Sequence, residues 1–117
     1  MGPFLDNRLS HGYNYEKTSE AIMTALILTY HLKDEETRDA FYHALIENQI
    51  QSLTQQEAGC IKYDYYLPCH CSSDLLLVEI WESPAHQTAH TQQPHFAKTQ
   101  ALKAQFGVIL DCESFTR

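Results

Sequence analysis

The sequence predicts one α+β domain whose elements follow the order β-α-β-β-α-β, the ferredoxin-like arrangement. Three observations support this prediction: apolar segments typical of strands, intervening stretches with helix start and stop signals, and a length of 117 residues that suits a single domain. The order implies a four-stranded antiparallel sheet with its helices on one face. Because the other face then needs cover, we expect a homodimer formed through the sheet face.

The first strand and the first helix are predicted near the start of the domain. Residues 24–32, TALILTYHL, are β-branched, aromatic or leucine, which is typical of a strand buried on at least one face. Asp34 is expected to cap a helix whose first turn is acidic and which runs unbroken to about Gln55. The apolar half of this helix is predicted to contain Phe41, Tyr42, Leu45, Ile46, Ile50 and Leu53.

A β-hairpin is predicted to follow Gly59, which ends the helix. Residues 60–67, CIKYDYYL, alternate as a half-buried strand does. One face of this strand is expected to carry Ile61, Tyr63, Tyr65 and Leu67. The polar turn at 68–74 separates it from the strongly apolar strand at 75–81.

Two helices and a strand complete the predicted domain. Ser83 is expected to cap a short helix with proline at its first position, and Gln93-Pro94 to begin a longer helix through about Phe106, closed by Gly107. Residues 108–115, VILDCESF, are predicted to form the last strand. The polar residues 1–20 are expected to be a loosely ordered extension, so the domain spans 21–117.

Composition and charge disfavour several functions. A net charge of −7 with only eight Lys and Arg argues against binding to nucleic acid and to anionic membranes. No apolar run approaches the roughly 20 residues of a membrane span, and the first 20 residues carry no secretory signal. We therefore expect a cytoplasmic protein whose four cysteines are reduced thiols.

The histidine-rich segment 86–96 raises the question of a metal site. His86 and His90 have the spacing of a zinc-binding helix, but Gln87 stands where a metalloprotease has its general base. The Cys69-x-Cys71 turn lacks a second cysteine pair. No glycine-rich nucleotide loop is present either. From the sequence we expect no metal and no bound cofactor.

Residues 79–96, EIWESPAHQTAHTQQPHF, resemble the antibiotic biosynthesis monooxygenase (ABM) family, whose members often combine Glu-x-Trp with a later histidine and Pro-His-Phe. The positions in register are Glu79, Trp81, Glu82, Ala85, Ala89, His90, Pro94, His95 and Phe96. Residues 57–64, EAGCIKYD, are similar to the family's Glu-Pro-Gly-Cys-x-x-Tyr-Asp segment, with Ala58 replacing the proline. The resemblance covers about residues 22–115.

The resemblance implies a dimeric α+β barrel with a ligand cavity between sheet and helices in each subunit. The family includes cofactor-free oxygenases of aromatic phenols and quinols, haem-degrading enzymes and an isomerase of a phosphorylated sugar derivative. Haem degradation is disfavoured, because His90 and Gln100 stand where that branch has a tryptophan and a histidine. The isomerase pattern, a histidine followed after three residues by Pro-His-aromatic, resembles the run from His90 to Phe96.

His90 is the predicted catalytic base, because histidine exchanges protons near neutral pH and a cofactor-free oxygenase must first make an electron-rich anion. The predicted substrate-binding residues are Trp81, His95, Asn48, Gln49, Tyr65 and Phe96. Structural roles for these residues remain open. The predicted function is cofactor-independent oxygenation of a small phenol or quinol. The alternatives are isomerisation or tautomerisation of a small polar metabolite, and non-enzymatic ligand binding by a dimer.

Overall fold

The computed structural model describes residues 22–117, so the extension predicted at 1–20 lies outside the described residues. The elements are β1 (Thr24–His31), α1 (Glu35–Glu47), α2 (Ile50–Gln55), β2 (Cys60–Tyr66), β3 (Asp74–Trp81), α3 (Pro84–His90), α4 (Pro94–Gln105) and β4 (Ile109–Thr116). The four strands form one antiparallel sheet in the order β2-β3-β1-β4. This confirms the ferredoxin-like α+β fold that the sequence predicts.

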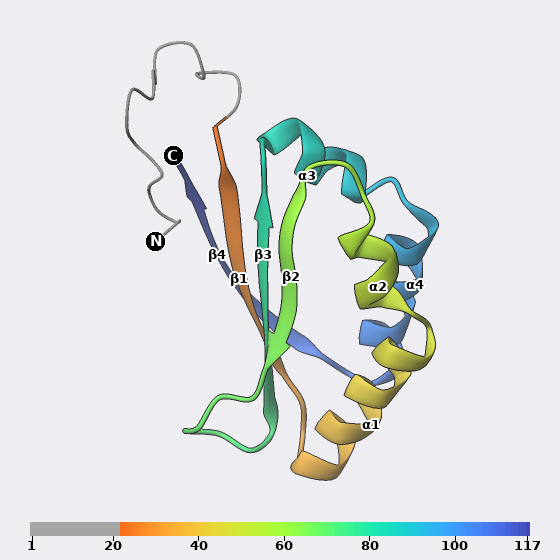
Figure 1. Cartoon of the computed structure of the whole chain (residues 1–117). Helices are drawn as coiled ribbons and strands as arrows, with labels where there is room; N and C mark the ends of the chain where they lie inside the picture. The colour runs from red at the N-terminus through yellow and green to blue at the C-terminus, as the bar shows by residue number, and fades with distance from the viewer. Residues whose placement is uncertain (1–21) are drawn as a thin grey trace.

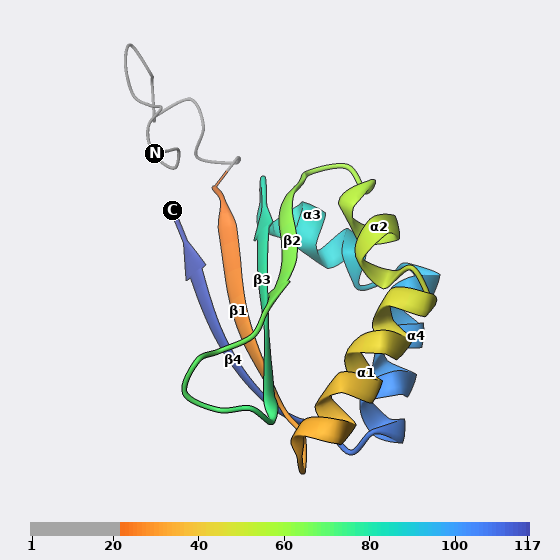
Figure 2. The same cartoon turned by 60° about the horizontal axis from the view of Figure 1, so that its bottom comes forward.

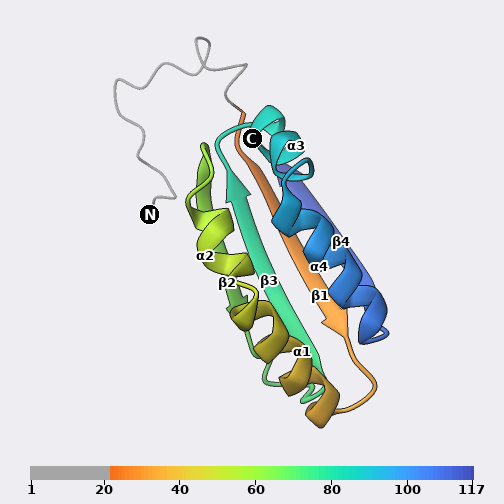
Figure 3. The same cartoon turned by 90° about the vertical axis from the view of Figure 1, so that its right-hand side faces the viewer.

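All the helices lie on one face of the sheet (Figure 1). Helices α1 and α2 follow one another along one side of this layer, and α3 and α4 follow along the other (Figure 3). The view in Figure 2 shows the opposite face of the sheet with no described element on it. The helix-covered face therefore contains the core, and the bare face is available for a partner.

The core forms where alternate residues of the central strands meet the helices. Leu28 and Tyr30 of β1 and Leu77 of β3 are buried on this face, as the two-residue period of a strand requires. The ring of Phe41 on α1 packs edge-on against Tyr30, with centroids 5.4 Å apart. The core cluster comprises Leu28, Tyr30, Leu32, Phe41, Leu45, Ile50, Tyr63, Leu75, Leu77 and Leu102.

The long first helix predicted to reach Gln55 is wrong, because it breaks at Asn48 and Gln49. Gln49 adopts the left-handed conformation with φ of 57°, and its N–H donates to the carbonyl of Ile46 instead of Leu45, while both the N–H and the side-chain amide of Asn48 donate to the carbonyl of Ala44. The break turns α2 onto β2, where the side-chain amides of Gln51 and Gln55 both donate to the carbonyl of Tyr63. Three residues predicted on the apolar half are partly exposed: Tyr42, Ile46 and Leu53.

The strict alternation predicted for the second strand is also wrong at its start. A β-bulge between Cys60 and Lys62 gives β2 one extra residue opposite β3. Cys60 therefore pairs with Trp81 and packs against the core, whereas Ile61 is 51% exposed. Leu67, expected on the same face, lies beyond the strand and is exposed.

The predicted helix boundaries are otherwise confirmed. Asp34 Oδ1 accepts a hydrogen bond of 2.8 Å from the backbone N–H of Thr37, and Ser83 Oγ accepts one from the N–H of His86. Gly107 closes α4 with a positive φ of 68°. None of the helices that the structure describes is long and apolar enough to cross a membrane.

Candidate active site

The turn between α2 and β2 positions Glu57 against the end of α3 and the start of α4. Glu57 is followed closely by Gly59, whose φ is 82°, and a Cβ at this glycine would clash with the ring of His86. The carbonyl of Gly59 accepts a hydrogen bond of 2.8 Å from the N–H of Glu82, just before α3. Only glycine allows both this backbone conformation and this close approach. The turn therefore fixes where the Glu57 carboxylate lies.

Two histidines bind the same oxygen of Glu57. Its Oε2 lies 2.7 Å from Nδ1 of His90 and 2.6 Å from Nε2 of His95. The side chains of Glu57, His90 and His95 are 12%, 3% and 11% exposed. Because a carboxylate only accepts hydrogen bonds, both facing nitrogens carry the proton when Glu57 is ionised. The neutral rings then keep their lone pairs on Nε2 of His90 and Nδ1 of His95.

Aromatic rings enclose His90. The ring of Trp81 lies 5.0 Å from it at 32°, and Tyr63 and Phe96 pack against it edge-on at 5.8 and 5.2 Å. This packing holds the imidazole in one orientation and separates it from bulk water. Trp81 is itself fixed, because its Nε1–H donates a hydrogen bond of 3.0 Å to Oε1 of Glu79.

Glu79 is a buried carboxyl beside this aromatic group. Burial raises the pKa of Glu79, and the hydrogen bond from Trp81 opposes that effect. Among the described residues no Lys, Arg or His lies within ion-pair distance of it. Burial also raises the pKa of the Cys60 thiol to about 11, so this cysteine lacks the thiolate character of a nucleophile.

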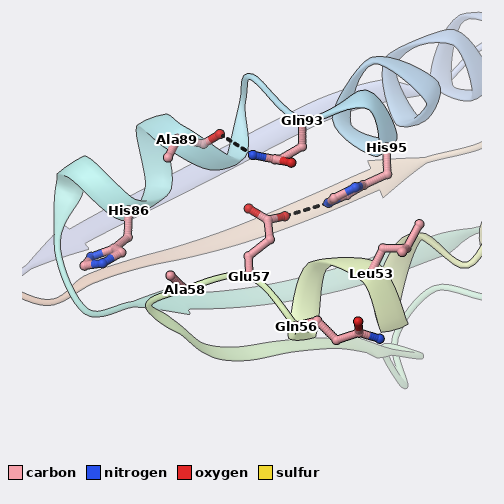
Figure 4. Close-up of a pocket in the computed structure, with 8 residues that line it drawn as sticks. All are labelled: Leu53, Gln56, Glu57, Ala58, His86, Ala89, Gln93 and His95. Atoms are coloured by element: carbon pink, nitrogen blue, oxygen red, sulfur yellow. Dashed lines mark hydrogen bonds and ion pairs between the residues drawn. The ribbon is translucent and has the colours of Figure 1, made fainter.

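An open pocket of about 450 Å³ lies beside Glu57 and His95. Figure 4 shows the side chains of Glu57 and His95 pointing toward one another in the wall of this pocket, joined by their hydrogen bond. The lining residues are Leu53, Gln56, Glu57, Ala58, His86, Ala89, Gln93 and His95. Most are polar, and the aromatic rings around His90 are not among them. A ligand in the pocket would therefore meet Glu57 and His95 first, with His90 behind them.

The structure brings four of the seven predicted site residues together: His90, Trp81, His95 and Phe96. Tyr65 packs against Tyr63 instead of His90, with ring centroids 5.9 Å apart, and its buried hydroxyl has no hydrogen-bond partner among residues 22–117.

Asn48 and Gln49 do not join this group. The amide of Asn48 is bound to the carbonyl of Ala44, and Gln49 is exposed at the break between α1 and α2. The residue that sequence reasoning missed is Glu57. The signal that could have identified it is its place as the first residue of the segment 57–64 that resembles the family.

His86 and His90, which have the spacing of a zinc-binding helix, do not share a hydrogen-bond partner. Nδ1 of His86 shares a hydrogen bond of 2.8 Å with Ser83 Oγ, whereas His90 turns to Glu57. Within residues 22–117, the donor atoms of Glu57, His90 and His95 instead form a group that could hold a metal ion, all within 4.8 Å of one another.

A second histidine–carboxylate cluster lies on the bare face of the sheet. Nδ1 of His31 lies 2.8 Å from Asp74 Oδ1, and Nε2 lies 2.7 Å from Asp111 Oδ2. The hydrogen bond that His31 makes to Asp111, and after it the one to Asp74, raise the pKa of His31 above its ordinary value. The aspartates come from β3 and β4, which flank His31 on β1. The pocket's lining residues do not include this cluster.

Comparison with known proteins assigns the chain to a family. A family profile described as antibiotic biosynthesis monooxygenase, ABM, matches residues 23–102. The chain belongs to the ABM family. The match confirms the resemblance seen in the sequence, and it includes Glu57, His90 and His95. No curated protein matches the chain.

Solved ABM-like structures share the fold at low sequence identity. A conserved protein of unknown function and possible oxidoreductase from Bacteroides thetaiotaomicron is 19% identical, with a TM-score of 0.70 over 85% of this chain and 100% of that one. A candidate antibiotic biosynthesis monooxygenase from Nitrosomonas europaea is 18% identical, with a TM-score of 0.68 over 81% of this chain and 88% of that one. A conserved protein from Methanosarcina mazei Go1 is 17% identical, with a TM-score of 0.69 over 87% of this chain and 97% of that one. At these identities the likeness supports the fold alone.

Proposed function

We propose that this ABM-family chain is a monooxygenase-type enzyme that takes a proton from a small phenol or quinol in the pocket beside Glu57 and His95. The observation that carries this proposal is the single carboxylate oxygen bound by two histidines at the wall of a 450 Å³ pocket. Glu57 and His95 reach the pocket, so they are the groups that meet the substrate. His90, the base expected from the sequence, lies behind them as a positioning residue.

The chemistry follows from what oxygen requires. Triplet oxygen reacts slowly with closed-shell phenols and more readily with the electron-rich anion, so deprotonation is the step that the protein must assist. One oxygen atom then enters the ring, and the other leaves as water with two hydrogens from the quinol. The quinol supplies all four electrons and becomes a hydroxyquinone. Glu57 or His95 would accept the first proton, and the partial burial of both favours this transfer by limiting water.

Oxygen uptake with a panel of small quinols tests the proposal. Wild-type protein should consume oxygen, and Glu57→Gln should lower kcat by roughly 10²- to 10⁴-fold because the shared acceptor is lost. Asp111→Asn is the matched control, since it alters the other histidine–carboxylate cluster and should keep wild-type activity. Uptake that is absent from wild type, or equal in wild type and Glu57→Gln, would refute the proposal.

Two side-chain amides in the pocket wall support a second candidate, isomerisation or tautomerisation of a small polar metabolite. Gln56 and Gln93 line the pocket beside Glu57 and His95, and they could bind polar groups of such a ligand. The same Glu57–His95 pair would move a proton between two substrate atoms without oxygen. Enzyme-dependent exchange of substrate C–H hydrogen for deuterium, in phosphorylated sugar ketones and without oxygen uptake, would identify this reaction. Tight ligand binding without exchange or uptake would instead indicate a non-enzymatic binding dimer.

We also propose that the bare sheet face packs against a second copy of the chain. Phe115, Ala25 and Ile80 pair across three strands on this face, and Phe115 is 51% exposed. Val78 is the next residue of β3 on this face after Ile80, and it pairs with Ile27 of β1. Such an apolar row is typical of an interface. Sedimentation velocity should give a dimer for wild type and a monomer for Val78→Lys. A wild-type monomer would refute the proposal.

A further inference from the structure

We propose that Glu57, His90 and His95 form a binding site for a divalent transition-metal ion of the Zn²⁺ or Fe²⁺ class. The three donors come from the turn before β2, the end of α3 and the start of α4, and the fold alone brings them together. Their donor atoms all lie within 4.8 Å of one another. Two imidazoles and one carboxylate are a donor set that suits these ions and is unsuited to Mg²⁺ or Ca²⁺.

The present spacing can be brought to that of a ligated ion by a small movement of the side chains. Ligand atoms bound tetrahedrally at about 2.1 Å lie roughly 3.4 Å apart around a metal. Glu57 Oε2 lies 2.7 Å from the facing nitrogen of His90 and 2.6 Å from that of His95, so seating an ion requires these two distances to lengthen by roughly 0.7–0.8 Å. Each imidazole would also shift its ring proton to its other nitrogen, which leaves the facing lone pair free to bind.

The charges around the group favour a cation. The ion-pair partners of Glu57 in the described part of the chain are the two histidines themselves. No lysine or arginine there forms an ion pair with it, so with neutral imidazoles the group carries a net negative charge. Formation of a metal complex would compensate this charge in a site where solvent reaches only about a tenth of each pocket-side residue, Glu57 and His95.

The surroundings give the proposed site one closed and one open side. Behind it, the rings of Trp81, Tyr63 and Phe96 hold His90 and exclude water. In front, Glu57 and His95 line the 450 Å³ pocket, so further coordination positions would face a ligand or water. Three protein donors with an open position are typical of catalytic rather than structural metal sites.

This inference does not rest on the proposed function, because binding is measured without turnover. The two are nevertheless linked. A metal ion on Oε2 of Glu57 occupies the atom that both histidines now bind, so the ion and the hydrogen-bonded arrangement exclude one another.

Trp81 supplies a direct readout, because it is the chain's single tryptophan and its ring lies 5.0 Å from that of His90. Chelator-treated protein would be titrated with Co²⁺, a paramagnetic probe that quenches a nearby indole. Saturable quenching at one ion per chain is expected, with recovery of fluorescence when Zn²⁺ displaces Co²⁺. A Cys69→Ser/Cys71→Ser background removes thiols that would also bind these ions.

Variants assign the signal to the three donors. Glu57→Gln and His95→Ala should each weaken Co²⁺ binding at least about tenfold, because each removes a ligand. His43→Ala is the matched control, since His43 is an exposed histidine of α1 outside the group and the pocket lining, and should keep wild-type affinity. Far-UV circular dichroism checks folding, and the near-isosteric Glu57→Gln keeps the test valid where His95→Ala does not fold. Unsaturable quenching, or equal affinity in wild type and Glu57→Gln, would overturn the proposal.

Discussion

Two histidine–carboxylate clusters lie on opposite faces of the same sheet, and their compositions are inverted. On the helix-covered face one carboxylate, Glu57, lies between two histidines. On the bare face one histidine, His31, lies between Asp74 and Asp111. The distances are nearly equal, but the surroundings differ. His90 is 3% exposed, whereas His31 is 36% and Asp111 is 78% exposed.

Hydrogen-bond geometry alone therefore does not identify an active site. Around His31 water screens the contact with Asp111, so that contact contributes little to stability and changes mainly the pKa of the imidazole. Around Glu57 aromatic rings and a pocket replace the water, so the same type of contact can direct a proton or an ion. The predictions below test whether burial separates the two clusters.

The largest effect is expected for Trp81→Ala. Trp81 is fully buried, holds the ring of His90 and donates to Glu79, so its loss should cost about 3–5 kcal/mol of unfolding free energy. Urea unfolding followed by far-UV circular dichroism measures the loss without needing the tryptophan. Asp111→Ala in the exposed cluster should stay within about 0.5 kcal/mol of wild type. Equal losses in the two variants would show that burial does not distinguish the two clusters.

Local sequence signals predicted most of the fold. The cap at Asp34, the Ser83-Pro84 start and the apolar strand at 75–81 each depend on neighbours within a few residues. The break at Gln49 and the bulge at Ile61 could not be predicted this way. Both depend on how α2 and β2 pack against the rest of the fold.

The candidate site was only half predictable for a related reason. Trp81, His90, His95 and Phe96 lie in one segment that resembles the family, so sequence placed them together. Glu57 lies 33 and 38 residues away from its two partners, and only the fold shows that it joins them. His31 likewise meets an aspartate 80 residues away, through strand pairing that no local pattern specifies.

A smaller loss of stability is expected for Gly59→Ala, which disturbs the turn that carries Glu57. An L residue at its left-handed φ costs roughly 1–2 kcal/mol, and the added Cβ would meet the His86 side chain, for a total of about 2–4 kcal/mol. Gly107→Ala is the matched control, because its φ is also positive but nothing lies within 4 Å of the new Cβ. Equal losses in urea unfolding would show that the close approach to His86 does not matter.

A gain in stability is expected for Glu79→Gln near neutral pH, and it should be smaller than the losses expected for Trp81→Ala and Gly59→Ala. Burial raises the pKa of Glu79 in the folded protein, so the ionised carboxylate costs stability above the pKa of the unfolded chain. The cost disappears as the pH falls through the raised pKa, and Gln can still accept from Trp81. Urea unfolding of wild type and Glu79→Gln at several pH values measures how the difference in their unfolding free energies depends on pH. Exposed Glu82→Gln should show no such gain, and a gain for Glu79→Gln that persists at acid pH would contradict the explanation.

The smallest effect on stability is expected from the exposed cluster itself. The pKa of His31 is raised, so its protonated form stabilises the fold below the unfolded pKa, and this contribution is lost as the pH rises through the folded value. Asp111→Asn and Asp74→Asn should each move the pKa of His31 back toward its ordinary value, as NMR titration of the imidazole would show. The matched control is Asp64→Asn, whose carboxylate pairs with Lys62, and it should leave His31 unchanged.

NMR titration of His31 also tests whether a second copy of the chain covers the bare face of the sheet. If a second copy covers the bare sheet face, His31 lies at or near the interface and loses water on association. Its pKa should then differ between the dimer and the Val78→Lys monomer, while the fluorescence of Trp81 on the helix-covered face stays the same. A pKa for His31 that is identical in both states would place the cluster outside the interface. A change in Trp81 fluorescence would show that the two faces are coupled through the sheet.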